Sequence, residues 1–369
     1  MKIGIIITNP NHHFEMTLSV ALKLREMGYD PFYISLCEMR RMRTPTDKLN
    51  EHGLEFFSQA AISEELKPST GAKTLGSNQS PLRNLLRSIF WALKIKPFVA
   101  RAIKSADRIL LMNDTAYPGD KIASLLNQKE IPFYLLQEGI RFPLPGEGKS
   151  SYGSNGATKL FTWGDRSAKY FASVIQTKTQ VEITGSPRFD SFIKEISGLS
   201  KDPDSKTLGV FTNPIDDQGF CTKAEKLSLF ERFVDKAAPY LKEHGISLGV
   251  KCHPREDLSE YLNLANKHID VRALDKDIKK AISQVDAGII MASTVGLELL
   301  GAGKPIGQLE IPEYGWVFDY TDSASTLKIP VEGKFDMSVL FEIDVDKDYF
   351  NSQISLGQSV ELIASHLVN

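Results

Sequence analysis

The sequence predicts an α/β protein of two doubly wound parallel-sheet domains that face a central cleft. The chain has 369 residues, which is too long for one ordinary α/β core and fits two domains of about 150 to 200 residues. Short apolar runs alternate with amphipathic helical patterns in both halves, an order typical of parallel sheets covered by helices on both faces. A polar stretch at residues 198–206 interrupts the alternation and indicates a connection between the domains.

The first half opens with a βαβ pattern. We expect a strand at residues 2–8, a loop at 9–14, a helix at 15–27 that Gly28 ends, and a strand at 31–36. Further strands are expected at residues 108–112, 132–136, 159–163 and 181–184. This assigns residues 1–197 to the first domain.

The second half repeats the alternation. Strands are expected at residues 207–212, 247–251, 270–273, 287–291 and 305–309. This assigns residues 207–350 to a second domain. A final helix at about 353–366 leaves residues 351–369 as a C-terminal segment that could pack back on the first domain.

Composition limits the class of protein. The 44 basic and 46 acidic residues give a formal charge of -2, so we expect no nucleic-acid partner. Three separated cysteines with no CxxC pair argue against disulfides and structural zinc and favour a reducing compartment. No apolar run has the length of a signal-peptide core or a membrane span, so a cytoplasmic location is expected.

A histidine directly after an expected strand is the most informative feature of the second half. In the run Lys251-Cys252-His253-Pro254-Arg255, the proline biases His253 toward an extended backbone. Ligands of open α/β sheets bind outside the carboxyl ends of the strands. The imidazole, with Lys251 beside it, could therefore donate to the phosphate of a leaving nucleotide. A surface histidine before a turn is the alternative interpretation.

A hydroxyl pair follows the expected strand that ends at residue 291. Ser293 and Thr294 would lie at the start of a helix, where free backbone N–H groups and the helix dipole attract phosphate. Glu298, about one turn further on, could hold ribose hydroxyls. The alternative is an ordinary helix cap followed by an ordinary exposed helix residue.

Candidates for a general base occur in the first half. Gln137, Glu138 and Gly139 follow the expected strand that ends at residue 136, so the carboxylate could face the cleft and its neighbours could contact an acceptor. His12 and His13, in the expected first loop, are rival bases, and His12 could also bind an acceptor. A simple turn is the alternative for the glutamate and glycine. We expect no metal, since no carboxylate or cysteine lies at ligand spacing from the histidines.

A third strand-end turn spans residues 184–190, near the expected hinge. It contains Gly185, Ser186 and Arg188, and the arginine could reach a phosphate. A rigid corner between the domains is the competing interpretation.

A basic, acid-free segment lies between Glu65 and Asp107. Its basic residues are Lys67, Lys73, Arg83, Arg87, Lys94, Lys96, Arg101 and Lys104. The apolar residues among them are Leu85, Leu86, Ile89, Phe90, Trp91 and Leu93. We interpret residues 81–104 either as a helix that makes peripheral contact with an anionic membrane, on the inner face of the plasma membrane, or as a core-packing helix with a solvated basic face.

Three of these motifs resemble, in order and type, the signatures of bacterial sialyltransferases and related capsule enzymes with the GT-B fold. They are Gln137-Glu138-Gly139, His253-Pro254 and Ser293-Thr294. The segments 184–190 and 293–305 further resemble capsule-polysaccharide Kdo transferases and CDP-glycerol glycerophosphotransferases. The likeness covers about residues 130–310.

The resemblance implies two Rossmann-like domains and a division of roles in the site. In those sialyltransferases the first acid is the general base, the histidine protonates or binds the leaving phosphate, and the hydroxyl pair holds the nucleotide phosphate. Gln137 replaces the first acid here, which moves the base to Glu138, His12 or His13. The replacement also weakens the case for CMP-sialic acid, so UDP- and CDP-linked donors remain open.

We therefore predict an inverting, metal-independent and cofactor-free glycosyltransferase of bacterial surface polysaccharide synthesis, of the capsule or lipopolysaccharide type. It would move a sugar from a CMP-, UDP- or CDP-linked donor in the second domain to a glycan or lipid-linked acceptor in the first. The alternatives are a nucleotide-sugar 2-epimerase or hydrolase on the same scaffold, and a non-catalytic sugar-nucleotide or glycan-binding assembly protein. No GxxxxGK or GxGxxG motif occurs, which disfavours ATP hydrolysis and NAD chemistry.

Overall fold

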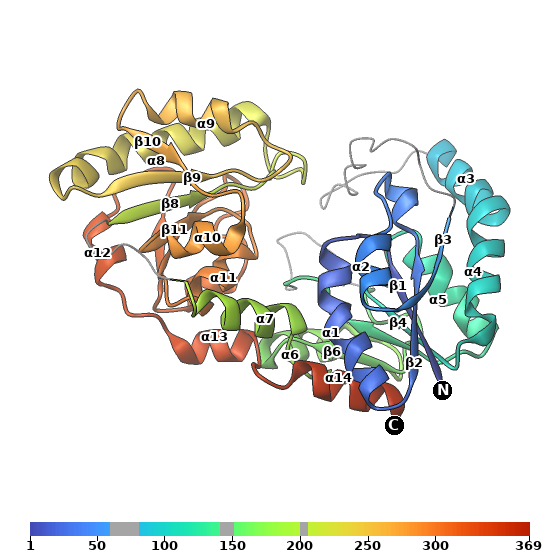
Figure 1. Ribbon diagram of the computed structural model, residues 1–369. Helices are drawn as coiled ribbons and strands as arrows, with labels where there is room; N and C mark the ends of the chain where they lie inside the picture. The colour runs from blue at the N-terminus through green and yellow to red at the C-terminus, as the bar shows by residue number, and fades with distance from the viewer. Residues whose placement is uncertain (60–80, 141–150, 200–205) are drawn as a thin grey trace.

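The computed structural model describes residues 1–59, 81–140, 151–199 and 206–369. These residues form two α/β domains that lie side by side, the first on the right and the second on the left of Figure 1. Most of the expected connection at 198–206 lies outside the described residues. So do Lys67 and Lys73 of the basic segment.

The first domain is built on a seven-stranded sheet with the order β3-β2-β1-β4-β5-β6-β7, in which every pair is parallel. Its strands are β1 (Lys2–Ile7), β2 (Asp30–Ser35), β3 (Glu55–Ser58), β4 (Arg108–Leu111), β5 (Phe133–Leu136), β6 (Lys159–Thr162) and β7 (Gln180–Ile183). Its longer helices are α1 (His12–Glu26), α2 (Thr46–Glu51), α3 (Pro81–Phe90), α4 (Lys96–Ala102), α5 (Gly119–Gln128), α6 (Asp165–Val174) and α7 (Pro187–Ile196). The π-helical turn η2 (Trp91–Ile95) joins α3 to α4, and the 3-10 turns η1 (Cys37–Arg40) and η3 (Ile103–Ser105) follow β2 and α4.

The second domain is built on a six-stranded, all-parallel sheet with the order β10-β9-β8-β11-β12-β13. Its strands are β8 (Thr207–Phe211), β9 (Ser247–Lys251), β10 (Val271–Ala273), β11 (Ala287–Ile290), β12 (Ile306–Leu309) and β13 (Thr326–Ile329). Its helices are α8 (Lys223–Glu243), α9 (Leu258–Ala265), α10 (Ile278–Ser283), α11 (Val295–Gly301) and α12 (Met337–Glu342), with the 3-10 turn η4 (Asp319–Asp322). The α13 (Lys347–Gln353) and α14 (Ser359–Val368) helices end the chain.

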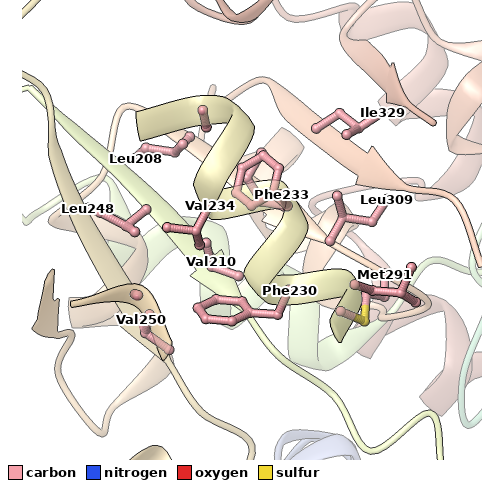
Figure 2. Packing of buried hydrophobic residues seen from close by; sticks show 14 of the residues in the cluster. Leu208, Val210, Phe230, Phe233, Val234, Leu248, Val250, Met291, Leu309 and Ile329 are labelled. Atoms are coloured by element: carbon pink, nitrogen blue, oxygen red, sulfur yellow. The ribbon is translucent and has the colours of Figure 1, made fainter. Parts of the chain in front are cut away.

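The central strands are buried along their length, as expected where helices cover both faces of a parallel sheet. β8, β11 and β12 have only buried residues. In Figure 2, Phe230, Phe233 and Val234 of α8 pack against Val210 of β8 and Val250 of β9 in the core of the second domain. This packing holds the carboxyl ends of the strands in place.

Each sheet has one point where the order of its strands reverses, between β1 and β4 in the first domain and between β8 and β11 in the second. Chain connections leave such a point in opposite directions, which opens a crevice outside the carboxyl ends of the strands, and ligands of open α/β sheets bind there. Two candidate sites are thus fixed by topology alone.

The end of the chain runs from the second domain to the first along the bottom of Figure 1. α13 packs against α6, and α14 packs against α1, with Ile363 and Leu367 buried in the core of the first domain. A further core cluster joins the two domains and includes Trp163, Phe189 and Phe350.

The structure differs from the sequence-based expectations in three places. β3 and β13 were not expected; both are four-residue strands at sheet edges with mostly half-exposed residues, so their apolar signal is weak. The expected final helix is two helices, because the chain turns at Gly357, whose φ is 95°. His12 and His13 lie in the first turn of α1 and not in a loop.

The described part of the basic segment forms α3, η2, α4 and η3, with α3 and α4 at the right of Figure 1. Among the described residues, no helix is both long and apolar enough to span a membrane.

Candidate functional site

A carboxylate and two histidines meet at the reversal point of the first sheet. Glu138 follows β5, and its Oε1 lies 2.9 Å from Nε2 of His13 in the first turn of α1. The backbone N–H of Thr8 donates to Nδ1 of His13 over 3.2 Å. Because Nδ1 accepts a hydrogen bond, the neutral imidazole carries its proton on Nε2. The Nε2–H group therefore donates a hydrogen bond to Glu138. Asn113, after β4, is 3.4 Å from the other carboxylate oxygen.

These contacts keep Glu138 ionised. Burial by itself would raise the pKa of Glu138, but the hydrogen bond from His13 and the positive charge of Arg40 help to lower that pKa to about 2. His13 is buried, whereas about a quarter of the Glu138 side chain is exposed. The carboxylate, and not His13, is therefore the group that a ligand reaches.

His12 supports the same loop from a second position. Its Nε2 donates to the backbone oxygen of Glu138 over 2.9 Å, and Asn9 accepts from the His12 N–H. Burial, together with the charge of Arg188, lowers the pKa of His12 to about 4. His12 is therefore neutral at pH 7 and holds Glu138 by its backbone.

A small hollow opens beside this group. It is lined by Thr8 and His13, by Arg40 of η1, by Glu138, and by four residues after β4, namely Asn113, Ala116, Pro118 and Gly119. The hollow therefore places one positive charge and one carboxylate around the same space, at the crevice predicted by the strand order.

At the reversal point of the second sheet, one dipeptide links two expected motifs. Thr212 and Asn213 follow β8, between the ends of β9 and β11. Thr212 accepts from the backbone N–H of His253 over 3.2 Å, and Asn213 donates to the backbone oxygen of Ala292 over 2.7 Å. His253 and Ser293 thus flank one strand, about 10 Å apart at two strand spacings.

The ring of His253 has a defined proton position. The backbone N–H of Arg255 donates to its Nδ1 over 3.2 Å, so the neutral ring carries its proton on Nε2. Burial, assisted by the charges of Arg255 and Lys251, lowers the pKa of His253. At neutral pH this histidine is therefore an N–H donor.

A buried ionic network lies behind His253. Lys226 is 2.6 Å from both Asp216 and Glu256. Glu256 also accepts from Thr212 over 2.7 Å and from Tyr261 over 2.6 Å. Thr212 therefore connects the network to the backbone of His253, which limits movement of the imidazole.

Ser293 and Thr294 lie at the start of α11, half-buried. The Ser293 hydroxyl accepts from the Val295 N–H over 3.3 Å, and Tyr320 donates to the Ser293 backbone oxygen over 2.9 Å. The Thr294 side chain makes no capping hydrogen bond. This leaves hydroxyl groups at the same end of the sheet as His253.

Lys251 and Pro254 lie on either side of Cys252 and His253. Lys251 ends β9 and donates to the backbone oxygen of Cys252 over 3.1 Å, and Pro254 is exposed. The lysine therefore remains beside His253, although its ammonium group is turned to the backbone.

An ion pair between the domains joins the two halves of the site. Arg188, in the first turn of α7, donates to Glu298 of α11. Glu298 is only 1% exposed, and burial raises its pKa although Arg188 opposes the rise. The positive charge of Arg188 also acts on His12. Arg188 thus contacts the helix that follows the hydroxyl pair and is close enough to His12 to lower its pKa.

Two residues that were expected to bind ligands, Gln137 and Glu298, are buried and make contacts within the protein. Gln137 is fully buried, and its side chain bonds to Gly139, Ser167 and the Trp163 N–H, so the expectation that it contacts an acceptor is not supported by its position. The side-chain amide of Gln137 thus connects the end of β5 to the segment after β6 by hydrogen bonds. Glu298 is buried and pairs with Arg188 through Oε1, whereas its Oε2 has no hydrogen-bond partner among the described residues.

The turn at residues 184–190 packs tightly. Gly185 has a φ of 81°, and a Cβ there would lie 2.1 Å from the backbone oxygen of Ser355. Ser186 is fully buried. Gly185 therefore packs against the C-terminal segment, whereas Arg188 is half-exposed. Gly139, by contrast, has open space where a Cβ would be.

Sequence reasoning missed Thr212, Asn213 and Asn113. A signal was present, because the tripeptide Thr-Asn-Pro follows the first strand of each sheet, at residues 8–10 and 212–214. Oδ1 of Asn213 is buried and has no hydrogen-bond partner among the described residues. An unsatisfied buried acceptor at a reversal point is a candidate ligand contact.

Comparison with protein-family models finds no match, and comparison with curated proteins finds none either. Solved structures do match over the whole chain. UDP-GlcNAc 2-epimerase from Methanocaldococcus jannaschii superposes with a TM-score of 0.64 at 13% identity, covering 100% of this chain and 99% of that one. The Neisseria meningitidis UDP-GlcNAc 2-epimerase bound to UDP-GlcNAc gives 0.59 at 12%, covering 100% of both. The kitacinnamycin glycosyltransferase gives 0.55 at 12%, covering 100% and 94%.

These likenesses and the two parallel sheets define the class. The chain has the GT-B fold of two Rossmann-like domains, as the sequence predicted. At this level of identity the comparisons establish the fold and leave the reaction to be argued from the site.

Proposed function

We propose that this protein is a glycosyltransferase that uses a nucleotide-activated sugar. It would invert the configuration at the anomeric carbon and would need no metal. The observation that carries the proposal is the complementary chemistry of the two reversal points. The first holds an ionised carboxylate, Glu138, and the second holds N–H and O–H donors, His253, Ser293 and Thr294. A carboxylate suits an acceptor hydroxyl, and donors suit a departing phosphate.

The transfer follows from these placements. Glu138 takes the proton of an acceptor hydroxyl whose oxygen attacks the anomeric carbon. The bond from that carbon to the nucleotide phosphate breaks, and the phosphate keeps the electron pair. His253, through Nε2–H, and the hydroxyls of Ser293 and Thr294 then hydrogen-bond the new phosphate charge. His12 and His13 position Glu138.

We assign the nucleotide phosphate to the second domain and the acceptor to the first. In this scheme residues 207–350 bind the donor, residues 1–197 bind a glycan acceptor, and the hollow beside Glu138 receives the acceptor hydroxyl. Arg188 supplies positive charge between them. A UDP-linked donor is favoured because UDP-GlcNAc is bound in one of the similar structures.

A second candidate is a UDP-sugar 2-epimerase. The observation in its favour is that 2-epimerases from two organisms match the full length of the chain. In such a reaction Glu138 would remove a proton from the sugar of the donor, and no acceptor would be needed.

One experiment separates the two candidates. Thermal shift with UDP, CMP, CDP and GDP first identifies the nucleotide, since a ligand at about 100 Kd stabilises the folded protein by about 2.7 kcal/mol. The purified protein is then incubated with the matching UDP- or CMP-sugar, with and without a glycan acceptor. Product only with acceptor supports the transferase; an epimer or free sugar from donor alone contradicts it.

Variants at His253 test the donor site. His253→Ala should lose the nucleotide-dependent thermal shift and product formation, while the exposed His244→Ala should retain both. Unchanged product formation by His253→Ala would remove this histidine from the mechanism.

A further inference from the structure

An apolar stripe is exposed along α3 and η2. The exposed fractions are 56% for Leu85, 57% for Leu86, 46% for Ile89, 44% for Phe90 and 71% for Leu93. Positions one turn apart share a helix face, so these five side chains form one continuous stripe, called the α3 stripe below. Monomeric proteins seldom leave such patches uncovered without a binding role.

The stripe is attached to the first domain through η2 and α4 and through one contact from α3. Trp91, Ile95 and Val99 are buried in the core of the first domain. Arg87 lies over the ring of Tyr117 at 5.5 Å, and the tyrosine hydroxyl donates to the Arg87 backbone oxygen over 3.3 Å. The stripe is therefore presented by an anchored helix.

Exposed positive charge lies at the end of the stripe and beyond it. Lys94, Lys96, Arg101 and Lys104 are exposed on the same run of helical turns. The sequence has no acidic residue from 66 to 106. Apolar side chains for the acyl boundary beside cations for lipid headgroups are the combination with which helices bind anionic membranes in the plane of the interface.

We propose that the α3 stripe docks the first domain on an anionic lipid surface. The position fits a substrate at that surface, because Tyr117, which contacts Arg87, stands between Ala116 and Pro118 in the loop that lines the hollow beside Glu138. Docking thus brings the hollow near the lipid, where an acceptor carried on lipid would be found. The inference goes beyond the proposed reaction and does not rest on it, since lipid binding needs no donor.

Vesicle co-sedimentation with the full chain tests the proposal. Vesicles of phosphatidylcholine alone are compared with vesicles of equal parts phosphatidylcholine and phosphatidylglycerol. We expect binding to the anionic vesicles only, weakened by high salt. The double variant Leu86→Glu/Leu93→Glu should bind them at least tenfold more weakly, and Val339→Glu, at an exposed apolar site on α12 of the other domain, should bind as the wild type does.

A charge variant isolates the second part of the argument. Lys94→Gln/Lys96→Gln should weaken anionic binding about thirtyfold, which corresponds to about 1 kcal/mol for each removed charge. Circular dichroism and thermal unfolding show whether each variant is folded; the changes lie at exposed positions, so folding should be unaffected.

Three results would overturn the proposal. The first is that the wild type does not sediment with anionic vesicles, and the second is equal binding to neutral ones. The third is a dimer, detected by sedimentation velocity, that dissociates in Leu86→Glu/Leu93→Glu, because the stripe would then cover a second copy of the chain.

Discussion

Glu138 and His13 lie 125 residues apart in the chain, and their Oε1 and Nε2 atoms are 2.9 Å apart in the fold. The pair forms because α1 begins directly after β1, while Glu138 follows β5, two strands away in the same sheet. The Thr8 N–H fixes which ring nitrogen points at the carboxylate. Both residues line the hollow, but only Glu138 is substantially exposed there, with 26% of its side chain accessible against 4% for His13.

Glu138→Gln should lower kcat about 100-fold or more, since the amide still accepts from His13 but cannot take a proton from a substrate. Turnover with the donor identified above measures the effect. Glu26→Gln, an exposed change on the same domain, is the matched control. If Glu138→Gln turns over at the wild-type rate, another group is the base.

His12 predicts a dependence of stability on pH. Its pKa is about 4 in the folded chain and 6.5 when unperturbed, so the unfolded state binds more protons between these values. The stabilisation is complete above about pH 6.5 and is lost as pH falls through about 4, by about 3 kcal/mol at most. Urea unfolding across this range should show a smaller loss for His12→Asn than for the wild type. Identical pH profiles would contradict the lowered pKa.

Lys226→Met should destabilise the fold by about 3 to 5 kcal/mol, because Asp216 and Glu256 would keep buried charges without a cation. Urea unfolding monitored by fluorescence measures the change. Lys223→Met, also on α8, removes an exposed ion pair with Glu260 of α9 and should cost less than about 1 kcal/mol. Equal effects of the two changes would show that the network is not buried as described.

Arg188 and Glu298 should be coupled. Arg188→Met leaves the Glu298 carboxyl buried without its partner and should cost about 3 kcal/mol. The double variant Arg188→Met/Glu298→Gln should cost less than the sum of the single changes by about 1 kcal/mol or more, as measured in a double-mutant cycle of unfolding free energies. Strict additivity would mean that the residues do not interact in solution.

The sequence predicted most strands because the interior strands of a parallel sheet are continuous apolar runs, such as residues 2–8 and 287–291. β3 and β13 were not predicted, because these two edge strands are half-exposed and lack such apolar runs. His253, Ser293 and Glu138 were proposed as site residues by one rule, that polar residues after a strand face the ligand crevice. Gln137 satisfies the same rule and is nonetheless buried, since side-chain direction at a strand end depends on its neighbours.

The sequence by itself determined the fold class, the strand ends that carry polar groups and the basic apolar segment, because all three follow from local periodicity and composition. Only the tertiary structure decided that His13 supports Glu138, that Thr212 joins His253 to a buried ionic network, and that Arg188 pairs with Glu298 between the domains. Each of these depends on contacts between distant segments. Hydrogen bonds and desolvation act over a few ångströms in space, whatever the separation along the chain.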